Sequence, residues 1–336
     1  IVIFKFISKY YILTYMIISK TPYRISFFGG GSDYPNWYLK NGGSVISSTI
    51  NKYIYISCRE LPPYFNHKHR VVYSIVEEVK KVDEIKHRVV KHAIKNILKR
   101  KNSNLGLEIH YDGDFPSRTG MGSSSSFVVG LLNVLNNFFN KNVSKKYLAD
   151  QSINLEQKIL KEVVGSQDQI ASSFGGFNEI TFNKNGKYTI NPLLTKKMDL
   201  ERLEKNLILI FAGVRKNYGT ANDIAKTFVN KLTTEKKKNI FEIMEHTKMA
   251  KKLLKSKSFD EFGLLLNETW KLKKDLSSSI SNSRINDIYE YGMKSGAKGG
   301  KLLGAGGSGF FLFYVPTSKR NFFIKKFKNL IRVPFK

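Results

Sequence analysis

The stretch "PSRTGMGSSSSFVVGLLNVL" (residues 116–135) places two glycines and four consecutive serines directly before a long apolar run. A flexible linker would stay polar on both sides, whereas this segment turns apolar at Phe127. The pattern therefore predicts a polar loop that leads into a buried helix over residues 124–139. Gly120 and Gly122 would let the backbone approach a ligand closely.

Ser123 and Ser124 stand where this helix is expected to begin, and serine is a favoured helix N-cap. The N–H groups and the dipole at the start of a helix attract anions, so the loop predicts a phosphate cradle with a serine hydroxyl available to Mg²⁺. It is not a Walker A loop, because Gly-Lys-Ser/Thr is missing. The alternative, a well-capped core helix, accounts for one serine but not for four behind two glycines.

Composition limits the classes of protein that this chain can be. Its 336 residues are 41% hydrophobic, enough for one large domain or two joined ones. Cys58 is the single cysteine, which excludes an internal disulfide and favours a cytoplasmic location. The net charge of +29 suggests nucleic acid, but Lys and Arg are scattered from Lys5 to Lys336 without zinc-finger spacing or an RNA-stacking motif. We interpret the lysines as general surface residues and expect no nucleic-acid partner.

The first residues, "IVIFKFISKYYILTYMIISK", are apolar but interrupted by Lys5 and Lys9. This run is too broken for a membrane span, and it lacks the charged start and cleavage site of a signal peptide. Met16 is followed by a strand-like segment. We expect residues 1–15 to be a non-native or disordered extension outside the fold, and no membrane partner.

The rest of the chain alternates between strand-like and helix-like segments. Strands are expected over 16–28, 44–58, 105–112 and 206–213, and helices over 83–100, 144–164 and within 240–293. Gly165 is expected to end the second of these helices. The polar, turn-rich stretch around 190–205 predicts a division into lobes of residues 16–195 and 196–330.

Two further glycine-rich stretches stand out. In "PYRISFFGGGSDYPNW" (22–37) a strand enters three glycines before Asp33, which could accept hydrogen bonds from hydroxyl groups or simply cap its own turn. "GAGGSGFFLFYV" (304–315) contains a GxGxxG spacing, but here the loop precedes a strand. A dinucleotide fold needs strand, loop and then helix, so a different nucleotide fold or a packing loop remains.

Carboxylates for chemistry are found in "NLEQKILKEVVGSQDQIASSFGGFNE" (154–179). If Gly165 breaks the helix, Asp168 can turn back toward Glu156. An acidic pair beside a phosphate cradle suggests one metal ligand and one base. Surface carboxylates are the alternative for both residues, and the better interpretation for Glu162.

The stretches "PYRISFFGGGSDYP", "PSRTGMGSSSS" and "KLLGAGGSGFFLF", in this order, resemble the motifs of the GHMP sugar and metabolite kinases. The resemblance runs from Ile17 to Val315. The triple glycine, "SQDQIASSFGGFN" and "ETWKLKKDLSSSISN" are more narrowly similar to the D-glycero-D-manno-heptose 7-phosphate kinase branch. The resemblance implies an α+β fold, with an N-terminal lobe like ribosomal protein S5 domain 2 and a ferredoxin-like C-terminal lobe.

The resemblance also implies an ATP- and Mg²⁺-dependent kinase that phosphorylates a sugar phosphate, heptose 7-phosphate above all, at its anomeric hydroxyl. Asp168 would be the catalytic base, Arg24 would lie near the transferred phosphoryl group, and Ser124 and Glu156 would hold Mg²⁺. The residues expected to bind ATP are Pro116, Ser117, Gly120, Met121, Gly122, Ser123, Ser124 and Ser125. Those expected on the substrate side are Gly30, Gly31, Ser32, Asp33, Gly304, Gly306 and Gly307.

Some positions depart from the family pattern. Met121 replaces the usual leucine and Ser308 interrupts a run of glycines. Gly30 stands where galactokinases carry a glutamate, which predicts room for a terminal phosphate on the sugar. Arg215, Lys298 and Lys301 are candidates to bind that phosphate.

Other functions remain open. The alternatives are a fucokinase- or galactokinase-type enzyme acting on a free sugar, a non-catalytic regulator, or a nucleic-acid binder. The presence of Asp168, Ser124 and Glu156 speaks against a regulator. The oligomeric state is left open between monomer and homodimer.

Overall fold

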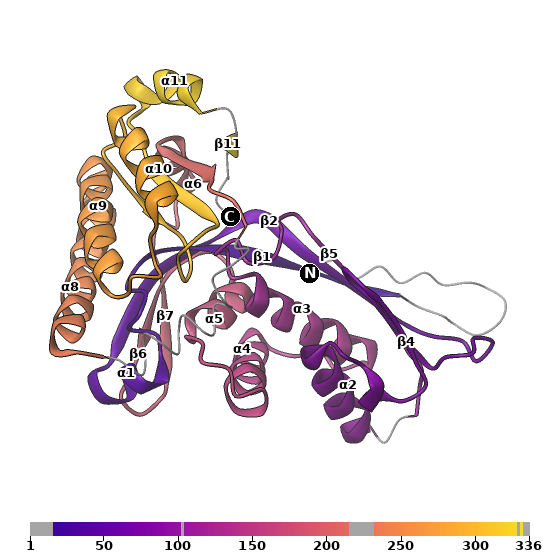
Figure 1. The fold of residues 1–336 in the computed structure, drawn as a ribbon. Helices are drawn as coiled ribbons and strands as arrows, with labels where there is room; N and C mark the ends of the chain where they lie inside the picture. The colour runs from indigo at the N-terminus through magenta and orange to yellow at the C-terminus, as the bar shows by residue number, and fades with distance from the viewer. Residues whose placement is uncertain (1–15, 102–103, 215–231, 328–329, 332–336) are drawn as a thin grey trace.

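A computed structural model describes residues 16–101, 104–214, 232–327 and 330–331, and Figure 1 shows that they form two lobes. Strands up to residue 192 build a seven-stranded sheet, and strands from residue 207 onward build a four-stranded one. The expected extension over residues 1–15 and the candidate Arg215 lie outside the described residues. Within the described ranges, no helix is both long and apolar enough to cross a membrane.

The sheet of the first lobe is organised by its longest strand, β2 (Gly43–Glu60). Antiparallel to it, β1 (Ile17–Phe28) pairs with residues 46–58. On its other side, β2 pairs with two strands. Residues 43–48 of β2 pair with β6, and residues 54–60 pair with β5. The remaining strands continue outward in the order β4-β3-β5-β2-β6-β7. Their bounds are β3 His69–Val72, β4 Val76–Val79, β5 Leu107–Gly113, β6 Phe177–Phe182 and β7 Tyr188–Pro192.

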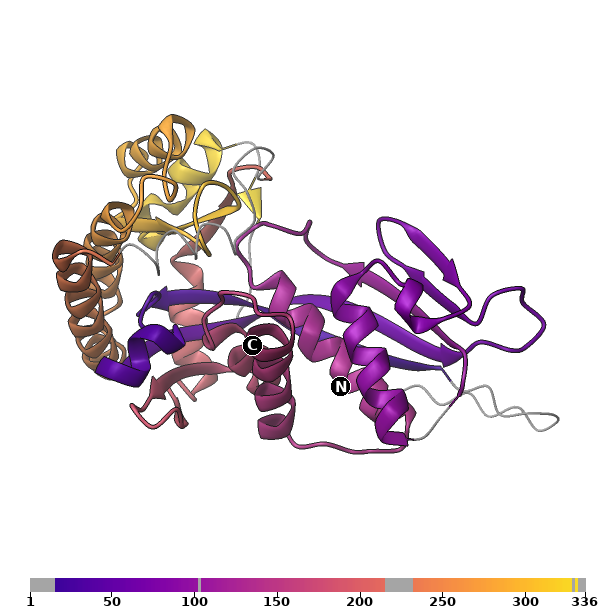
Figure 2. The same cartoon turned by 60° about the horizontal axis from the view of Figure 1, so that its bottom comes forward.

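Four helices cover one face of this sheet (Figures 1 and 2). They are α2 (Arg88–Lys101), α3 (Ser123–Phe138), α4 (Lys145–Ile153) and α5 (Gln167–Phe174). Helix α3 packs against both β1 and β2 and buries Val128, Leu131 and Leu135. A short helix, α1 (Pro35–Asn41), follows the triple glycine. The long apolar run after the serines thus forms the expected buried helix, shifted by one residue.

Two predicted helices differ from the structure. In place of the helix expected over 144–164, the α-helix α4 ends at Ile153 and a π-helical turn (Asn154–Ile159) follows it directly. The chain is irregular from Leu160 onward, so Gly165 does not end a helix. The apolar spacing persists through the π turn, which is why periodicity alone overextends the helix. The helix expected from residue 83 is a 3₁₀ turn (Val82–Glu84) followed by α2, and between them Glu77 accepts hydrogen bonds from the backbone of Lys86 and His87.

The second lobe has the antiparallel strand order β11-β8-β10-β9. Its strands are β8 Leu207–Phe211, β9 Gly299–Leu302, β10 Phe310–Tyr314 and β11 Leu330–Ile331. Its helices are α8 Thr234–Ser256, α9 Phe259–Asp275, α10 Ser283–Lys294 and α11 Thr317–Lys326. Helices follow β8 and β10, so the lobe has the split β-α-β arrangement of ferredoxin-like domains. The predicted α+β class is confirmed.

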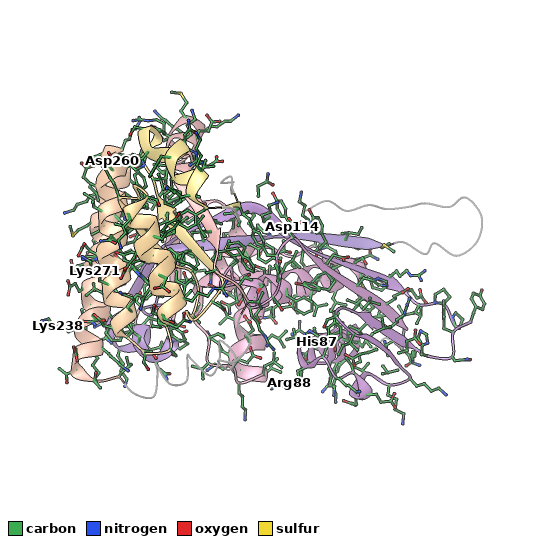
Figure 3. The ribbon with its side chains drawn as sticks, turned by 45° about the horizontal axis from the view of Figure 1, so that its top comes forward. His87, Arg88, Asp114, Lys238, Asp260 and Lys271 are labelled. Carbon is green, nitrogen blue, oxygen red and sulfur yellow. The ribbon has the colours of Figure 1, made fainter. Side chains whose placement is uncertain are left out.

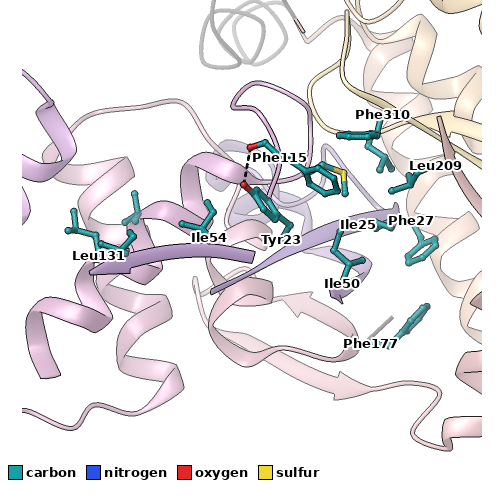
Figure 4. Close-up of a cluster of buried hydrophobic side chains, with 14 of the residues drawn as sticks. Tyr23, Ile25, Phe27, Ile50, Ile54, Phe115, Leu131, Phe177, Leu209 and Phe310 are labelled. Atoms are coloured by element: carbon teal, nitrogen blue, oxygen red, sulfur yellow. Dashed lines mark hydrogen bonds between the residues drawn. The ribbon is translucent and has the colours of Figure 1, made fainter. Parts of the chain in front are cut away.

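One hydrophobic core spans both lobes. Figure 4 shows Ile25 and Phe27 of β1 in the same cluster as Leu209 of β8 and Phe310 of β10. In the same cluster, the hydroxyl of Tyr23 donates a hydrogen bond to the backbone oxygen of Phe115. The predicted boundary after residue 195 falls just before α6 (Lys197–Lys205), which links the two sheets. We propose it as the division between the lobes.

Candidate active site

The three glycine-rich stretches come together between the lobes. The backbone N–H of Arg24 donates to the oxygen of Met121 at 3.2 Å, and that of Phe310 donates to the oxygen of Thr119 at 3.2 Å. Gly120 has φ +77°, and a Cβ added there would lie 2.4 Å from the backbone oxygen of Leu303. Side chains are thus excluded at Gly120, and the phosphate-type loop rests directly on the glycine loop of the second lobe.

Helix α3 begins differently from the sequence prediction. Its N-cap is Gly122, in the left-handed region with φ 73°, rather than a serine, and no side chain caps the helix. Ser123 and Ser124 are already inside the first turn, where Ser124 is exposed. The prediction of a serine cap is therefore wrong. An uncapped N-terminus leaves its N–H groups available to an anion, which suits a phosphate cradle better than a serine cap would.

Glu156 lies beside this first turn. The Ser125 hydroxyl donates to it at 2.9 Å, and the Ser124 hydroxyl lies 3.5 Å from the same carboxylate. The amide of Gln169 also donates to it. Glu156 is fully buried, and burial raises the pKa of its carboxyl to about 8. Among the described residues, no ion pair involves Glu156, so a bound cation would be its natural partner.

The donor set around Glu156 fits Mg²⁺, which prefers hard oxygen ligands and keeps few protein ones. One carboxylate and the hydroxyls of Ser124 and Ser125 supply such oxygens. Within the described residues, no group of three or more His, Cys, Asp or Glu could hold a metal by itself. A metal here would therefore share its coordination with phosphate oxygens. Sequence reasoning found Glu156 but missed Gln169, which has no signal beyond its place next to Asp168.

Arg24 and Asp168 form a bidentate pair. The guanidinium donates to the two carboxylate oxygens at 2.7 Å and 2.6 Å, and its third contact is the backbone oxygen of Gly120 at 2.8 Å. The Arg24 side chain is 5% exposed, whereas that of Asp168 is 22% exposed. The two residues predicted as catalytic thus meet at the phosphate-type loop, and the carboxylate keeps access to a ligand.

Asp33 lies next to this pair. It is buried, and its carboxylate accepts a hydrogen bond from Gly31 N at 3.0 Å. Burial, and then the charge of Asp168, raise the pKa of Asp33 to about 6. A Cβ added at Gly165 would lie 1.8 Å from the Asp33 carboxylate, so only glycine fits there. Asp33 therefore caps its own loop, as one interpretation of the sequence expected, and it also lies beside Asp168. Its contact with substrate hydroxyl groups stays a prediction.

Other predicted substrate-side residues have mainly structural contacts. The Ser32 hydroxyl donates to the backbone oxygens of Gly29 and Ser44 at 2.8 Å and 3.1 Å. Gly307 donates to Ile280 at 2.8 Å, and a Cβ on Gly306 would lie 2.6 Å from Ile280 Cα. These glycines contact the segment between α9 and α10, while Gly304 lies against Gly120.

Two residues predicted to bind ATP, Pro116 and Ser117, are exposed at the outer end of the loop. Lys298 donates to Asp260 at 2.6 Å and has no contact with the groups described above. Figure 3 labels Asp260 on α9.

Two lysines lie in the site. Lys301 donates to the Phe27 backbone oxygen at 2.7 Å, and Lys273 donates to those of Leu302 and Gly304, each at 2.7 Å. Lys301 was among the sequence candidates, whereas Lys273 was not. Lys273 lies in the segment "WKLKKDL", which contains three lysines. The spacing of apolar residues does not show which of these lysines faces the site.

An aromatic cluster, also missed from the sequence, flanks the start of α3. The His87 ring lies 4.9 Å from Tyr73 and 5.1 Å from Phe127, measured between ring centroids, and Tyr111 lies 5.3 Å from Phe127. Figure 3 shows His87 and Arg88 at the beginning of α2. These rings provide an apolar wall near the uncapped helix end.

Comparisons with known proteins identify the family of this chain. The model of the GHMP kinases N terminal domain matches residues 88–176, and that of the GHMP kinases C terminal domain matches residues 250–327. The D-glycero-alpha-D-manno-heptose 7-phosphate kinase of Campylobacter jejuni is 30% identical over 317 residues, 91% of each chain.

Two solved structures share the fold. A D-glycero-D-manno-heptose 1-phosphate kinase from Bacteroides thetaiotaomicron has a TM-score of 0.77 at 22% identity, covering 95% of each chain. A putative sugar kinase from Campylobacter jejuni has a TM-score of 0.75 at 26% identity, covering 96% of each chain. With both lobes matched, and a relative this similar over nearly its whole length, the chain belongs to the GHMP kinase family and is a phosphotransferase with an alcohol group as acceptor.

Proposed function

We propose that this kinase transfers the γ-phosphoryl group of ATP to the anomeric C1 hydroxyl of D-glycero-D-manno-heptose 7-phosphate. The product would be the 1,7-bisphosphate, which serves nucleotide-activated heptose and surface polysaccharide biosynthesis. The observation that carries the proposal is the Arg24–Asp168 pair, held against the Gly120 backbone with Asp33 alongside. The substrate class is supported by the similarity to the Campylobacter jejuni enzyme.

The residues divide the reaction between them. The acceptor hydroxyl would lie between Asp33 and Asp168, where Asp168 accepts its proton as the oxygen attacks the γ-phosphorus. The ADP oxygen leaves as the new P–O bond forms. Arg24 carries positive charge beside both the base and the loop, so it offsets charge on the transferred group. Positioning and charge neutralisation, rather than covalent catalysis, account for phosphoryl transfer here.

The nucleotide would lie across the start of α3. Its phosphates would accept hydrogen bonds from N–H groups between Gly120 and Ser125, and its base would pack near the aromatic cluster of Tyr73, His87, Tyr111 and Phe127. Ser124 and Glu156, with Ser125 close by, would hold Mg²⁺. When bound, the ion neutralises charge on the phosphate oxygens.

Steady-state kinetics would test the proposed substrate. ADP release is measured with D-glycero-D-manno-heptose 7-phosphate, with the free heptose, with fucose and with galactose. We expect kcat/KM for the phosphorylated heptose to exceed that for the free heptose at least tenfold. Equal values, or a higher value for fucose or galactose, would overturn the sugar-phosphate proposal in favour of a free-sugar kinase.

Gly30 offers a sharper test of this substrate choice. A Cβ added there would meet only the Ser26 hydroxyl, at 3.9 Å, so a longer side chain can be accommodated. We expect Gly30→Glu to raise KM for heptose 7-phosphate, because two unit charges about 4 Å apart repel by roughly 4 kcal/mol at an effective dielectric of 20. Gly30→Gln is the neutral control and should raise KM much less. A similar KM for both variants would rule out charge as the cause.

A further inference from the structure

Lys273 and Lys301 approach the junction of the lobes from different elements. Lys301 is on β9 and its ammonium reaches the Phe27 oxygen on β1, two residues before the triple glycine. Lys273 is on α9 and its ammonium reaches Gly304, which lies against Gly120. The two ammonium groups therefore lie between the loop proposed for the acceptor and the loop proposed for the nucleotide.

These cations are close to one another and to Arg24. Lys301 is buried with 3% of its surface exposed, and Arg24 with 4%. Desolvation, then the charges of Lys301 and Arg24, hold the pKa of Lys273 well below its usual range. Desolvation by burial, and then the positive charge of Arg24, lower the pKa of Lys301 to about 7.

The carboxylates nearby do not balance this charge. Asp168 on α5 is engaged by both donors of Arg24, and Asp33 accepts from its own loop. Within the described ranges, no ion pair joins Lys273 or Lys301 to an acid, and both donate to backbone oxygens instead. Lys301 is buried and Lys273 half-buried, so protonating these amines without a counter-charge is costly, and a bound anion would supply that counter-charge.

We propose that Lys273 and Lys301, together with Arg24, form a phosphate-binding subsite between the two lobes. This inference rests on the proposed phosphoryl transfer, because it places the cluster next to the reacting groups. Two phosphates have the right chemistry: the γ-phosphoryl group of ATP and the phosphate that the acceptor carries. A phosphate accepts several charge-assisted hydrogen bonds at once, so it can replace the backbone oxygens as the partner of each ammonium.

The test measures binding of inorganic phosphate to the full chain by titration calorimetry at pH 7 and low salt. The protein is first saturated with ADP and Mg²⁺, so that the cradle at α3 is filled. Lys273→Met and Lys301→Met are compared with the wild type, and thermal unfolding verifies that each variant is folded. Lys271→Gln is the matched control, because Lys271, labelled in Figure 3, is on the same helix as Lys273 but is exposed. It is paired with Glu268.

We expect at least tenfold weaker phosphate binding in each methionine variant and unchanged binding in Lys271→Gln. Titrations in two buffers of different ionisation enthalpy should also show proton uptake by the wild type that decreases in the variants, because an anion favours the charged amines. Wild-type affinity in both methionine variants, or no phosphate binding by the wild type, would overturn the subsite.

Repeating the titration with a non-hydrolysable ATP analogue distinguishes the two sources. Loss of phosphate binding assigns the subsite to the transferred group, whereas retained binding assigns it to the acceptor. Because neither titration involves a sugar or turnover, the subsite can fail while the proposed substrate stands, and the substrate can fail while the subsite stands.

Discussion

Arg24 holds the carboxylate of Asp168, the proposed base, in one orientation. Two hydrogen bonds fix the carboxylate plane, and partial exposure leaves it open to a hydroxyl. We expect Asp168→Asn to lower turnover by roughly 10² to 10⁴, the range for loss of a general base. The dissociation constant for ADP, measured by calorimetry, should stay within a factor of about three because the Asp168 carboxylate bonds Arg24 and not the nucleotide loop itself. Turnover near the wild-type rate would leave only positioning to explain the reaction.

The position of the Asp33 carboxylate depends on the absence of a side chain at Gly165. Since a Cβ there would lie 1.8 Å from the Asp33 carboxylate, Gly165→Ala must displace Asp33 or its own backbone. We expect KM for the acceptor to rise about tenfold or more, with KM for ATP nearly unchanged. The double variant Gly165→Ala/Asp33→Ala is the diagnostic control. If its acceptor kinetics are clearly worse than those of Asp33→Ala alone, Gly165 acts through something other than Asp33.

At the scale of elements, three of the four serines that open α3 divide between two kinds of contact. Ser124 and Ser125 face Glu156, whereas the Ser126 hydroxyl is bonded to the Pro22 oxygen at 3.1 Å and to Ser172 at 2.8 Å. We expect Ser124→Ala and Glu156→Gln to raise the Mg²⁺ concentration needed for half-maximal activity. Ser126→Ala should leave that concentration unchanged and lower the free energy of unfolding by about 1 kcal/mol. Mg²⁺ titrations of Ser124→Ala and Glu156→Gln that both match the wild type would contradict the metal assignment.

Element patterns in the sequence predicted β1, β2, β5, β8 and α3 to within one or two residues, because apolar periodicity and glycine loops are local signals. The short strands β3, β4, β6, β7, β9 and β11 were not predicted. The π turn at Asn154–Ile159 was not predictable. Its apolar residues continue the helical spacing, and the contact of Glu156 with Ser125 of α3 is a long-range one that no local pattern encodes. The uncapped start of α3 was also hidden, because its N-cap depends on a left-handed backbone at Gly122 rather than on a side chain.

At the scale of the molecule, the burial of Lys301 beside Arg24 lowers the stability of the fold near neutral pH. Its pKa is about 7 in the fold against 10.5 when unperturbed, so the unfolded chain binds more protons between these values and wild-type stability rises with pH there. At pH 7 the penalty is on the order of 4 kcal/mol, since each pKa unit is worth about 1.4 kcal/mol and half of the folded molecules already carry a neutral amine there. Replacing Lys301 also removes its hydrogen bond to the Phe27 backbone oxygen, and this loss lowers the free energy of unfolding by about 1–3 kcal/mol.

We therefore expect Lys301→Met to be more stable than the wild type at pH 7, by on the order of 2 kcal/mol. At pH 10 the order should reverse, because little of the desolvation penalty remains there and the lost hydrogen bond dominates. Urea unfolding at both pH values measures the difference. A variant that is less stable than the wild type at both pH values would show that the Lys301 ammonium is well compensated in the fold.

The arrangement of the two lobes was available from the sequence only through family resemblance. Local patterns do not specify that β2 pairs with β1, β5 and β6, nor that Leu209 and Phe310 share a core with β1. The site depends on such long-range contacts, since Arg24, Asp168 and Lys273 lie far apart in the chain. Sequence therefore identified individual candidate residues, Lys301 among them, but not Lys273, which approaches them from the second lobe.

The joint between the glycine loops is built from main-chain atoms: Phe310 donates to Thr119, and Gly304 rests on Gly120. A joint of this kind does not depend on which side chains surround it, provided that the glycines remain. Evolution could therefore replace polar side chains around this joint without shifting the two glycine loops, provided that the apolar core shared by the lobes is kept. Recombination between homologues at this seam would then preserve the geometry of catalysis while exchanging the surfaces that select a substrate.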